Sequence, residues 1–140
     1  KIPETVLYII GGNASEKLQH YESEHIIFTG RVPDVRVAIG KCEVFICPLQ
    51  FGSGIKTKNL EAMAMGMPVV TTPIGAENID ATDGVDWIIA ENDSDFIEAI
   101  VKLLNLDSTY RQKMGCLAQK FVRDNFTWEY AEQAFKKVMN

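Results

Sequence analysis

The sequence predicts an α/β fold built on a doubly wound, Rossmann-like parallel sheet, followed by a helical C-terminal tail. Short apolar runs alternate with segments of helical periodicity along the first two thirds of the chain. These runs are apolar throughout, as is typical of strands that are covered on both faces. Beyond about Ser94 the pattern is helical only. The expected strands are residues 5–10, 25–30, 44–49, 68–72 and 85–90.

The elements of the first half follow from local signals. The strand at 5–10 ends in two glycines, which predicts a turn, and residues 14–24 have a helical composition. Asp34 stands where it can cap a short helix at 35–39, since its carboxylate can accept hydrogen bonds from the first free N–H groups. The strand at 44–49 is stopped by a proline, which cannot donate to a sheet.

The second half begins with a loop up to Gly54 and a helix over about 56–65. Gly66 occupies the position where a helix commonly ends in a left-handed residue. Residues 74–84 are expected to be irregular. Asp93 or Ser94 is expected to cap a helix at 95–106, and two further helices follow, of which the last is capped by Thr127. Their ranges are 108–126 and 127–140.

Composition bounds the class of protein. The chain has 140 residues, a hydrophobic content of 46% and a net charge of −5. These values suit a single domain with its own core, and the charge argues against non-specific nucleic-acid binding. No apolar run is long enough to span a bilayer. The three cysteines form no C-x-x-C pair, so we expect a reducing, cytoplasmic compartment.

A candidate anion site lies in the loop from Gln50 to Ile55, which follows the expected strand at 44–49. Ligands of open parallel sheets bind outside the carboxyl ends of the strands. The glycines of this loop allow close approach of the backbone, and the next helix directs free N–H groups and its positive dipole end to the same space. Lys56 and Lys58 add positive charge, which suits a diphosphate.

Glu61 lies one helical turn after the lysines and shares a helix face with Lys58. A carboxylate does not bind phosphate, but it accepts two hydrogen bonds from vicinal hydroxyls such as those of a ribose. The pattern therefore predicts a site for a nucleoside diphosphate. The alternative is a simple loop followed by a surface ion pair worth less than about 1 kcal/mol. The loop matches neither the Walker A nor the G-x-G-x-x-G pattern.

The order of motifs resembles the C-terminal half of group 1 (family 4) glycosyltransferases, which have the GT-B fold. The matching pieces are YIIGG at 8–12, IIFTGRVPDV at 26–35, VFICPLQFGSGIKTKNLEAMAMGMPVVTTPIGAENI at 44–79, and the tail at 95–129. The resemblance implies retaining transfer of a sugar from a nucleoside-diphosphate sugar to an acceptor, with the donor held by this domain. It also implies that no metal and no other cofactor is needed.

The resemblance also assigns roles to single residues. Glu61 resembles the second glutamate of the family's E-x7-E motif and would bind the ribose diol, while Lys58 would face a phosphate; both are candidate catalytic residues. The remaining candidate donor-binding residues lie in three loops: Arg31 and Val32 beside the base; Gly52, Ser53, Gly54 and Ile55 beside the diphosphate and the donor sugar; and Thr72, Pro73 and Ile74 at the next strand end.

Two departures from the family pattern bear on function. The first glutamate of E-x7-E would fall at position 53, where this chain has Ser53. The N-terminal acceptor domain and the first strand-helix unit have no counterpart, so residues 1–140 would form a truncated domain, inactive alone and partnered by that missing domain. In the longer enzyme the acceptor can be membrane-associated. The alternatives are a non-catalytic α/β interaction module and another GT-B enzyme, such as a sugar-nucleotide epimerase.

Overall fold

The computed structural model describes residues 2–12 and 16–139. The chain forms two compact units that divide between Cys42 and Glu43. In both units, every pair of named strands is parallel, which confirms the α/β class with parallel sheets. The strands form one sheet in each unit, with two strands in the first and three in the second.

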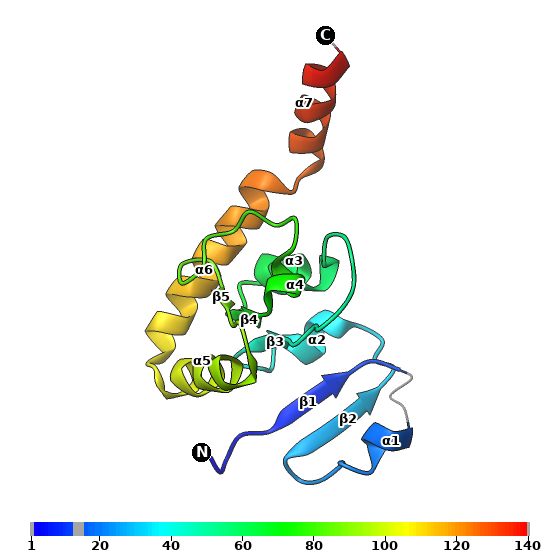
Figure 1. The fold of residues 1–140 in the computed structure, drawn as a ribbon, viewed down its shortest axis with the longest axis vertical. Coiled ribbons are helices and arrows are strands. Elements are labelled where there is room, and N and C mark those ends of the chain that lie inside the picture. Colours follow the sequence, from blue (N-terminus) through cyan, green and yellow to red (C-terminus); the bar gives the residue numbers. More distant parts are fainter. Residues whose placement is uncertain (1, 13–15, 140) are drawn as a thin grey trace. The chain divides into compact units, whose positions relative to one another are not determined.

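The first unit is built on strands β1 (Leu7–Ile10) and β2 (Ile26–Gly30), drawn in blue and a lighter blue in Figure 1. The helix between them, α1 (Glu16–Gln19), is shorter than expected, and the segment after it turns back to β2. Residues 14 and 15 of the predicted helix lie outside the described part of the chain.

Helix α2 (Val35–Ile39) ends the first unit and begins as predicted at Asp34, whose side chain accepts a hydrogen bond from the Arg36 N–H. The guanidinium of Arg36 also binds this carboxylate, with Nη2 2.8 Å from Oδ2. These hydrogen bonds to Arg36 hold the pKa of the Asp34 carboxyl below its usual range. The local sequence thus fixed the start of this helix.

The second unit holds a three-stranded sheet in the order β3-β4-β5. Its strands are β3 (Phe45–Cys47), β4 (Val69–Thr71) and β5 (Ile88–Ile89). Its helices are α3 (Thr57–Ala64), α4 (Pro73–Ala76), α5 (Asp93–Asn105), α6 (Ser108–Asn125) and α7 (Trp128–Met139). The two crossovers between parallel neighbours carry α3 and α4, as this connection requires.

Helices cover both faces of this sheet. Val70 and Thr71 are consecutive in β4, so their side chains point to opposite faces. Val70 belongs to a buried cluster with residues of α5 and α6, whereas the Thr71 hydroxyl contacts Asn59 of α3. Figure 1 shows α3 and α4 on one side of these strands and α5 on the other. The strands are apolar because helices cover both faces of the sheet.

Close packing joins α3 to α6 at two glycines. Gly66 ends α3 with a φ of +75°, the left-handed conformation that its position predicted. A Cβ built on Gly115 of α6 would lie 1.9 Å from the Gly66 carbonyl oxygen. The two backbones therefore touch directly, and only glycine fits at position 115.

Three sequence expectations were wrong in this unit. Helix α4 forms where we expected irregular structure, because Thr72 caps it by accepting from the Gly75 N–H, and Pro73 starts it. The cap of α5 is Asn92 and neither Asp93 nor Ser94; its Oδ1 accepts from the Asp95 N–H at 3.0 Å. Strand β5 has two residues where six were expected.

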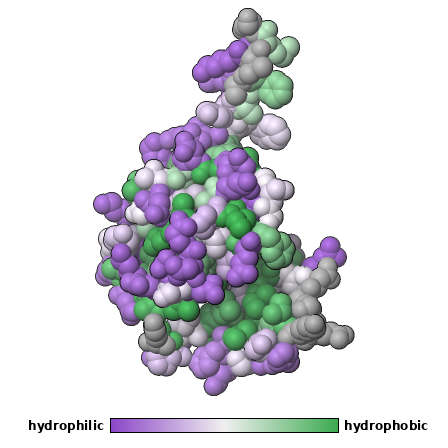
Figure 2. All heavy atoms as spheres, in the orientation of Figure 1, coloured by the Kyte–Doolittle hydropathy of each residue, from purple (hydrophilic) through white to green (hydrophobic). Residues whose placement is uncertain are grey.

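Helix α7 carries a row of exposed large side chains. Trp128 is 89% exposed and Phe135 is 72% exposed. Thr127 caps the helix as predicted, since the Tyr130 N–H donates to its Oγ1. Figure 2 shows hydrophobic atoms on this helix at the top of the view. No helix in the described chain is both long enough and apolar enough to cross a membrane.

Candidate functional site

The candidate site is the glycine loop, residues 51–56, which joins the carboxyl end of β3 to α3. Gly52 has a φ of +131° and Gly54 a φ of +75°. A side chain at either position would be strained, so the loop requires glycine twice within three residues. The backbone conformation of the loop therefore explains the two glycines of the predicted Gly-Ser-Gly motif.

The backbone N–H groups of this loop are unused. Across the described residues, no hydrogen bond takes its donor from the N–H of Gly52, Ser53, Gly54 or Ile55. No side chain caps the N-terminus of α3, which begins immediately afterwards. Free N–H groups gathered in a turn ahead of a helix N-terminus form a binding site for anions.

The two lysines of the motif have different environments. Lys58 is exposed, as a phosphate ligand must be before binding. Lys56 is only 8% exposed, and its Nζ donates to the Gly54 carbonyl oxygen at 2.6 Å. The same Nζ lies 3.6 Å from Oε2 of Glu77, which follows α4. Lys56 thus bonds within the protein, contrary to the expectation that both lysines are open to a ligand.

Glu61 is exposed on the same helix as Lys58. The buried face of α3 is made by Asn59, Ala62 and Met63, so Lys58 and Glu61 lie away from the core. The two form no ion pair in the described part of the chain, although their spacing would allow one. The alternative of a surface ion pair is therefore not realised, and both side chains are open to a ligand.

A buried polar network fixes α3 against the strand end. The Asn59 amide, fully buried, donates to the Thr71 hydroxyl at 3.0 Å and to the Gly75 carbonyl at 2.8 Å. A Cβ at Gly75 would lie 2.0 Å from the Thr71 hydroxyl oxygen, so this position also requires glycine. The network links the helix that carries Lys58 to β4 and α4.

A cavity of about 540 Å³ opens at the carboxyl edge of the three strands. This is the edge where open parallel sheets bind ligands. It is lined by residues that follow each strand: Pro48, Leu49 and Gln50 after β3; Thr72, Pro73 and Ile74 after β4; and Ala90, Glu91, Asn92, Asp93, Phe96 and Ile97 after β5. The structure thus brings the predicted residues Thr72, Pro73 and Ile74 to one cavity.

Thr72 uses its hydroxyl within the protein. Its Oγ1 donates to the Leu49 carbonyl at 2.5 Å and accepts from the Gly75 N–H at 3.1 Å. These bonds tie the segment after β3 to the segment after β4. The hydroxyl hydrogen is therefore already donated within the protein. In the structure, the Thr72 side chain connects two segments of the cavity wall.

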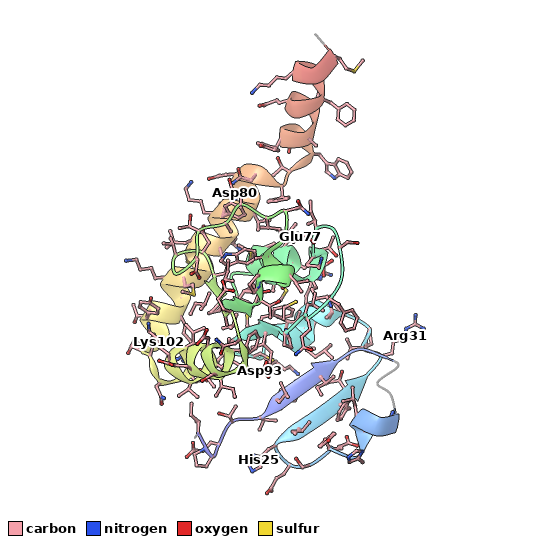
Figure 3. All side chains as sticks on the ribbon, viewed as in Figure 1. His25, Arg31, Glu77, Asp80, Asp93 and Lys102 are labelled. Atoms are coloured by element: carbon pink, nitrogen blue, oxygen red, sulfur yellow. The ribbon has the colours of Figure 1, made fainter. Side chains whose placement is uncertain are left out.

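The other predicted residues have distinct positions. Ser53 and Ile55 are exposed in the glycine loop. Arg31, which Figure 3 labels, is exposed after β2 in the first unit, where Val32 is half-buried. No cluster of three or more His, Cys, Asp or Glu side chains that could hold a metal ion occurs in residues 2–12 and 16–139.

Sequence reasoning missed the contribution of β5 to the cavity. Glu91, Asn92 and Asp93 stand at its carboxyl end, and Figure 3 shows Asp93 at the start of α5. Because all three strands are parallel, their carboxyl ends share an edge, and this rule applied to residues 85–90 would have found them. Nothing in the sequence distinguished Lys56 from Lys58.

Comparison with known proteins assigns the chain to a family. The family model described as glycosyl transferases group 1 matches residues 1–106. The chain belongs to this family. One relative, an uncharacterized glycosyltransferase of Methanocaldococcus jannaschii, is 28% identical over 95% of this chain and 36% of its own length. The lipopolysaccharide core biosynthesis mannosyltransferase of Rhizobium leguminosarum is 27% identical over 84% of this chain and 34% of its own.

Several solved structures share the fold of this chain. Anabaena HepE, solved in complex with UDP and glucose, matches with a TM-score of 0.80 and 17% identity over 99% of this chain and 41% of its own. A glycosyltransferase from Rickettsia africae matches with a TM-score of 0.76 and 16% identity over 96% of this chain and 39% of its own. This group 1 chain therefore has the Rossmann-like half of the GT-B fold, and it spans about a third of the length of its curated relatives.

Proposed function

We propose that the chain is the donor-binding domain of a retaining glycosyltransferase and that it holds a nucleoside-diphosphate sugar. The observation that carries this proposal is the row of unused N–H groups at Gly52, Ser53, Gly54 and Ile55, immediately before the uncapped start of α3. Membership of the group 1 family supports it. The complex of HepE with UDP and glucose, a protein of the same fold, supports the ligand class.

The proposed chemistry is the transfer of a glycosyl group. The bond between the sugar's anomeric carbon and the diphosphate oxygen breaks, and the diphosphate leaves with the electron pair. A new bond forms from the anomeric carbon to the oxygen of an acceptor hydroxyl, whose proton passes to the leaving diphosphate. The free N–H groups, which the loop conformation fixes before the reaction begins, and the charge of the Lys58 ammonium stabilise the negative charge of the leaving diphosphate. Glu61 accepts hydrogen bonds from the ribose hydroxyls.

The acceptor belongs to the same proposal. Relatives are named for Vi polysaccharide biosynthesis in Salmonella typhi and for lipopolysaccharide core biosynthesis in Rhizobium leguminosarum. We therefore propose a growing surface polysaccharide as the acceptor of the whole protein. Such acceptors are assembled at the membrane, and a peripheral, cytoplasmic position of the whole protein fits this role.

Calorimetric titration with UDP, GDP and ADP tests the donor site. We expect one diphosphate to bind better than the other two, and both Lys58→Ala and Glu61→Ala to weaken it about tenfold, which equals about 1.4 kcal/mol. Lys102→Ala and Glu98→Ala are matched controls, because they remove the same charges from the exposed surface of α5. Flat titrations with all three diphosphates on folded protein would contradict the proposal.

A 2′-deoxy nucleoside diphosphate separates the roles of the two residues. If Glu61 holds the ribose diol, the deoxy ligand binds the parent more weakly, while it binds Glu61→Ala almost as well as the ribose ligand does. Lys58→Ala keeps the full preference for the ribose ligand. An undiminished preference in Glu61→Ala would contradict the role of this carboxylate.

A further inference from the structure

The buried lysine of the glycine loop has no role in the proposed mechanism, and its position is unusual. Lys56 is 8% exposed, and removing an ammonium group from water is costly unless it is paired. The structure supplies two partners, the Gly54 carbonyl at 2.6 Å and the Glu77 carboxylate at 3.6 Å. The shorter of these contacts lies within the glycine loop itself.

The bond to Gly54 fixes the orientation of one peptide group. All peptide bonds are trans in the described chain, and the C=O and N–H of a trans peptide point in opposite directions. Because the Gly54 carbonyl points to the Lys56 ammonium, the Ile55 N–H of the same peptide points away from it. That N–H is one of the unused donors of the loop.

The Lys56 side chain also lies against the other glycine. A Cβ built on Gly52 would be 3.7 Å from Lys56 Cε and 3.9 Å from Nζ. The loop thus curves around the end of this side chain, from Gly52 to Gly54. The ion pair with Glu77, which Figure 3 labels beside α4, joins the loop to the segment after β4. Glu77 is 47% exposed, so water screens its side of this pair and weakens the attraction.

We propose that Lys56 is a positioning residue for the diphosphate: its ammonium holds the glycine loop with the N–H groups turned to the ligand, and it does not itself contact phosphate. This inference rests on the proposed function and assigns the second lysine of the same site. Lys58 supplies the charge that meets the phosphates, and Lys56 supplies the shape of the loop.

The test combines loop dynamics with affinity for UDP, GDP or ADP, whichever binds the parent. In the parent, we expect ¹⁵N order parameters of Ser53, Gly54 and Ile55 near the rigid value of about 0.85. Lys56→Met keeps the unbranched stem of the side chain as far as Cε but has no donor, so we expect these order parameters to fall below about 0.6. We expect the affinity for the diphosphate to fall about tenfold, while affinity for the bare nucleoside is unchanged.

Further variants separate positioning from direct contact. Lys56→Arg keeps a donor for the Gly54 carbonyl and restores most of the loop order and affinity. Lys58→Met, the matched control, lowers the affinity for the diphosphate to a similar extent but leaves the loop order parameters unchanged. Glu77→Gln changes both quantities by less than about twofold. Lys56→Gln, which keeps a polar end in the buried site, replaces Lys56→Met if the methionine variant does not fold.

Each outcome decides the matter. If Lys56→Met lowers the affinity for the diphosphate but leaves the loop order parameters unchanged, Lys56 is a direct phosphate ligand and the inference is overturned. A disordered loop with unchanged affinity would overturn it as well. Failure of the parent to bind any of the three diphosphates would instead remove the proposed function, and this inference with it.

Discussion

The crossing of α3 and α6 makes a sharp prediction about Gly115→Ala. A Cβ at this position would lie 1.9 Å from the Gly66 carbonyl oxygen and 2.7 Å from its carbonyl carbon. Both are backbone atoms, so no side-chain rotation relieves the overlap. The two backbones must move apart by about 1.5 Å to reach an ordinary contact, which disturbs the packing of the whole crossing.

The net effect has two opposing parts. Alanine in a helix interior is favoured over glycine by about 1 kcal/mol. Inserting a methyl group where none fits costs about 1–3 kcal/mol, and the backbone overlap at Gly115 places this change at the upper end. We therefore expect Gly115→Ala to lower the free energy of unfolding by about 2 kcal/mol, or the melting temperature by about 6–10 °C.

Urea denaturation followed by circular dichroism measures this change. Cys116→Ala is the control, because Cys116 is the exposed neighbour on the same helix, and we expect a change within about 0.5 kcal/mol. Gly66→Ala separates backbone strain from steric overlap. Its Cβ would meet the Gly115 carbonyl oxygen at an ordinary 3.8 Å, but alanine would have to adopt a positive φ. This variant should lower the free energy of unfolding by about 1–2 kcal/mol. A Gly115→Ala variant as stable as the parent would refute the packing argument.

Three other outcomes follow from buried polar groups. Asn59→Leu should lower stability by about 1–3 kcal/mol in urea denaturation, because the buried Gly75 carbonyl loses its donor; an unchanged midpoint would contradict this. Arg111→Met should also lower stability by about 1–3 kcal/mol. Its Nη1 donates to the carbonyls of three residues at the end of α5, and its Nη2 pairs with Glu43. A melting temperature equal to that of the parent would argue against this expectation. Burial raises the pKa of the Cys47 thiol, so its reactive thiolate forms at higher pH than in the unfolded chain. Alkylation near pH 8 should label the exposed Cys116 well before Cys47, as mass spectrometry can follow; equal rates would mean that Cys47 is not protected.

The same pKa shift bears on stability. A thiol whose pKa is raised on folding stays protonated in the native state while the unfolded chain already loses its proton. Stability is therefore unaffected by Cys47 at neutral pH and falls as the pH rises above the ordinary thiol pKa. We expect Cys47→Ser, measured by urea denaturation, to show less of this alkaline loss than the parent.

The sequence by itself determined the features that depend on one residue's conformation or on a short period. Asp34 capped α2, Gly66 took the left-handed position after α3, and the two glycines of the 51–56 loop have the positive φ values that such a turn requires. The parallel α/β class followed from apolar runs separated by helical segments. The loop with its free N–H groups was found because it stands directly after a strand.

Tertiary structure decided what depends on residues far apart in the chain. Lys56 and Lys58 are two residues apart with the same charge, and the approach of Glu77, 21 positions after Lys56, helps to make Lys56 internal while Lys58 stays open. The need for glycine at 115 comes from Gly66, 49 positions earlier. Strand β5 adds Glu91 to Asp93 to the cavity because parallel pairing with β4 brings its end to the same edge. Local propensity contains no information about such encounters, since they exist only once the helices have packed on the sheet.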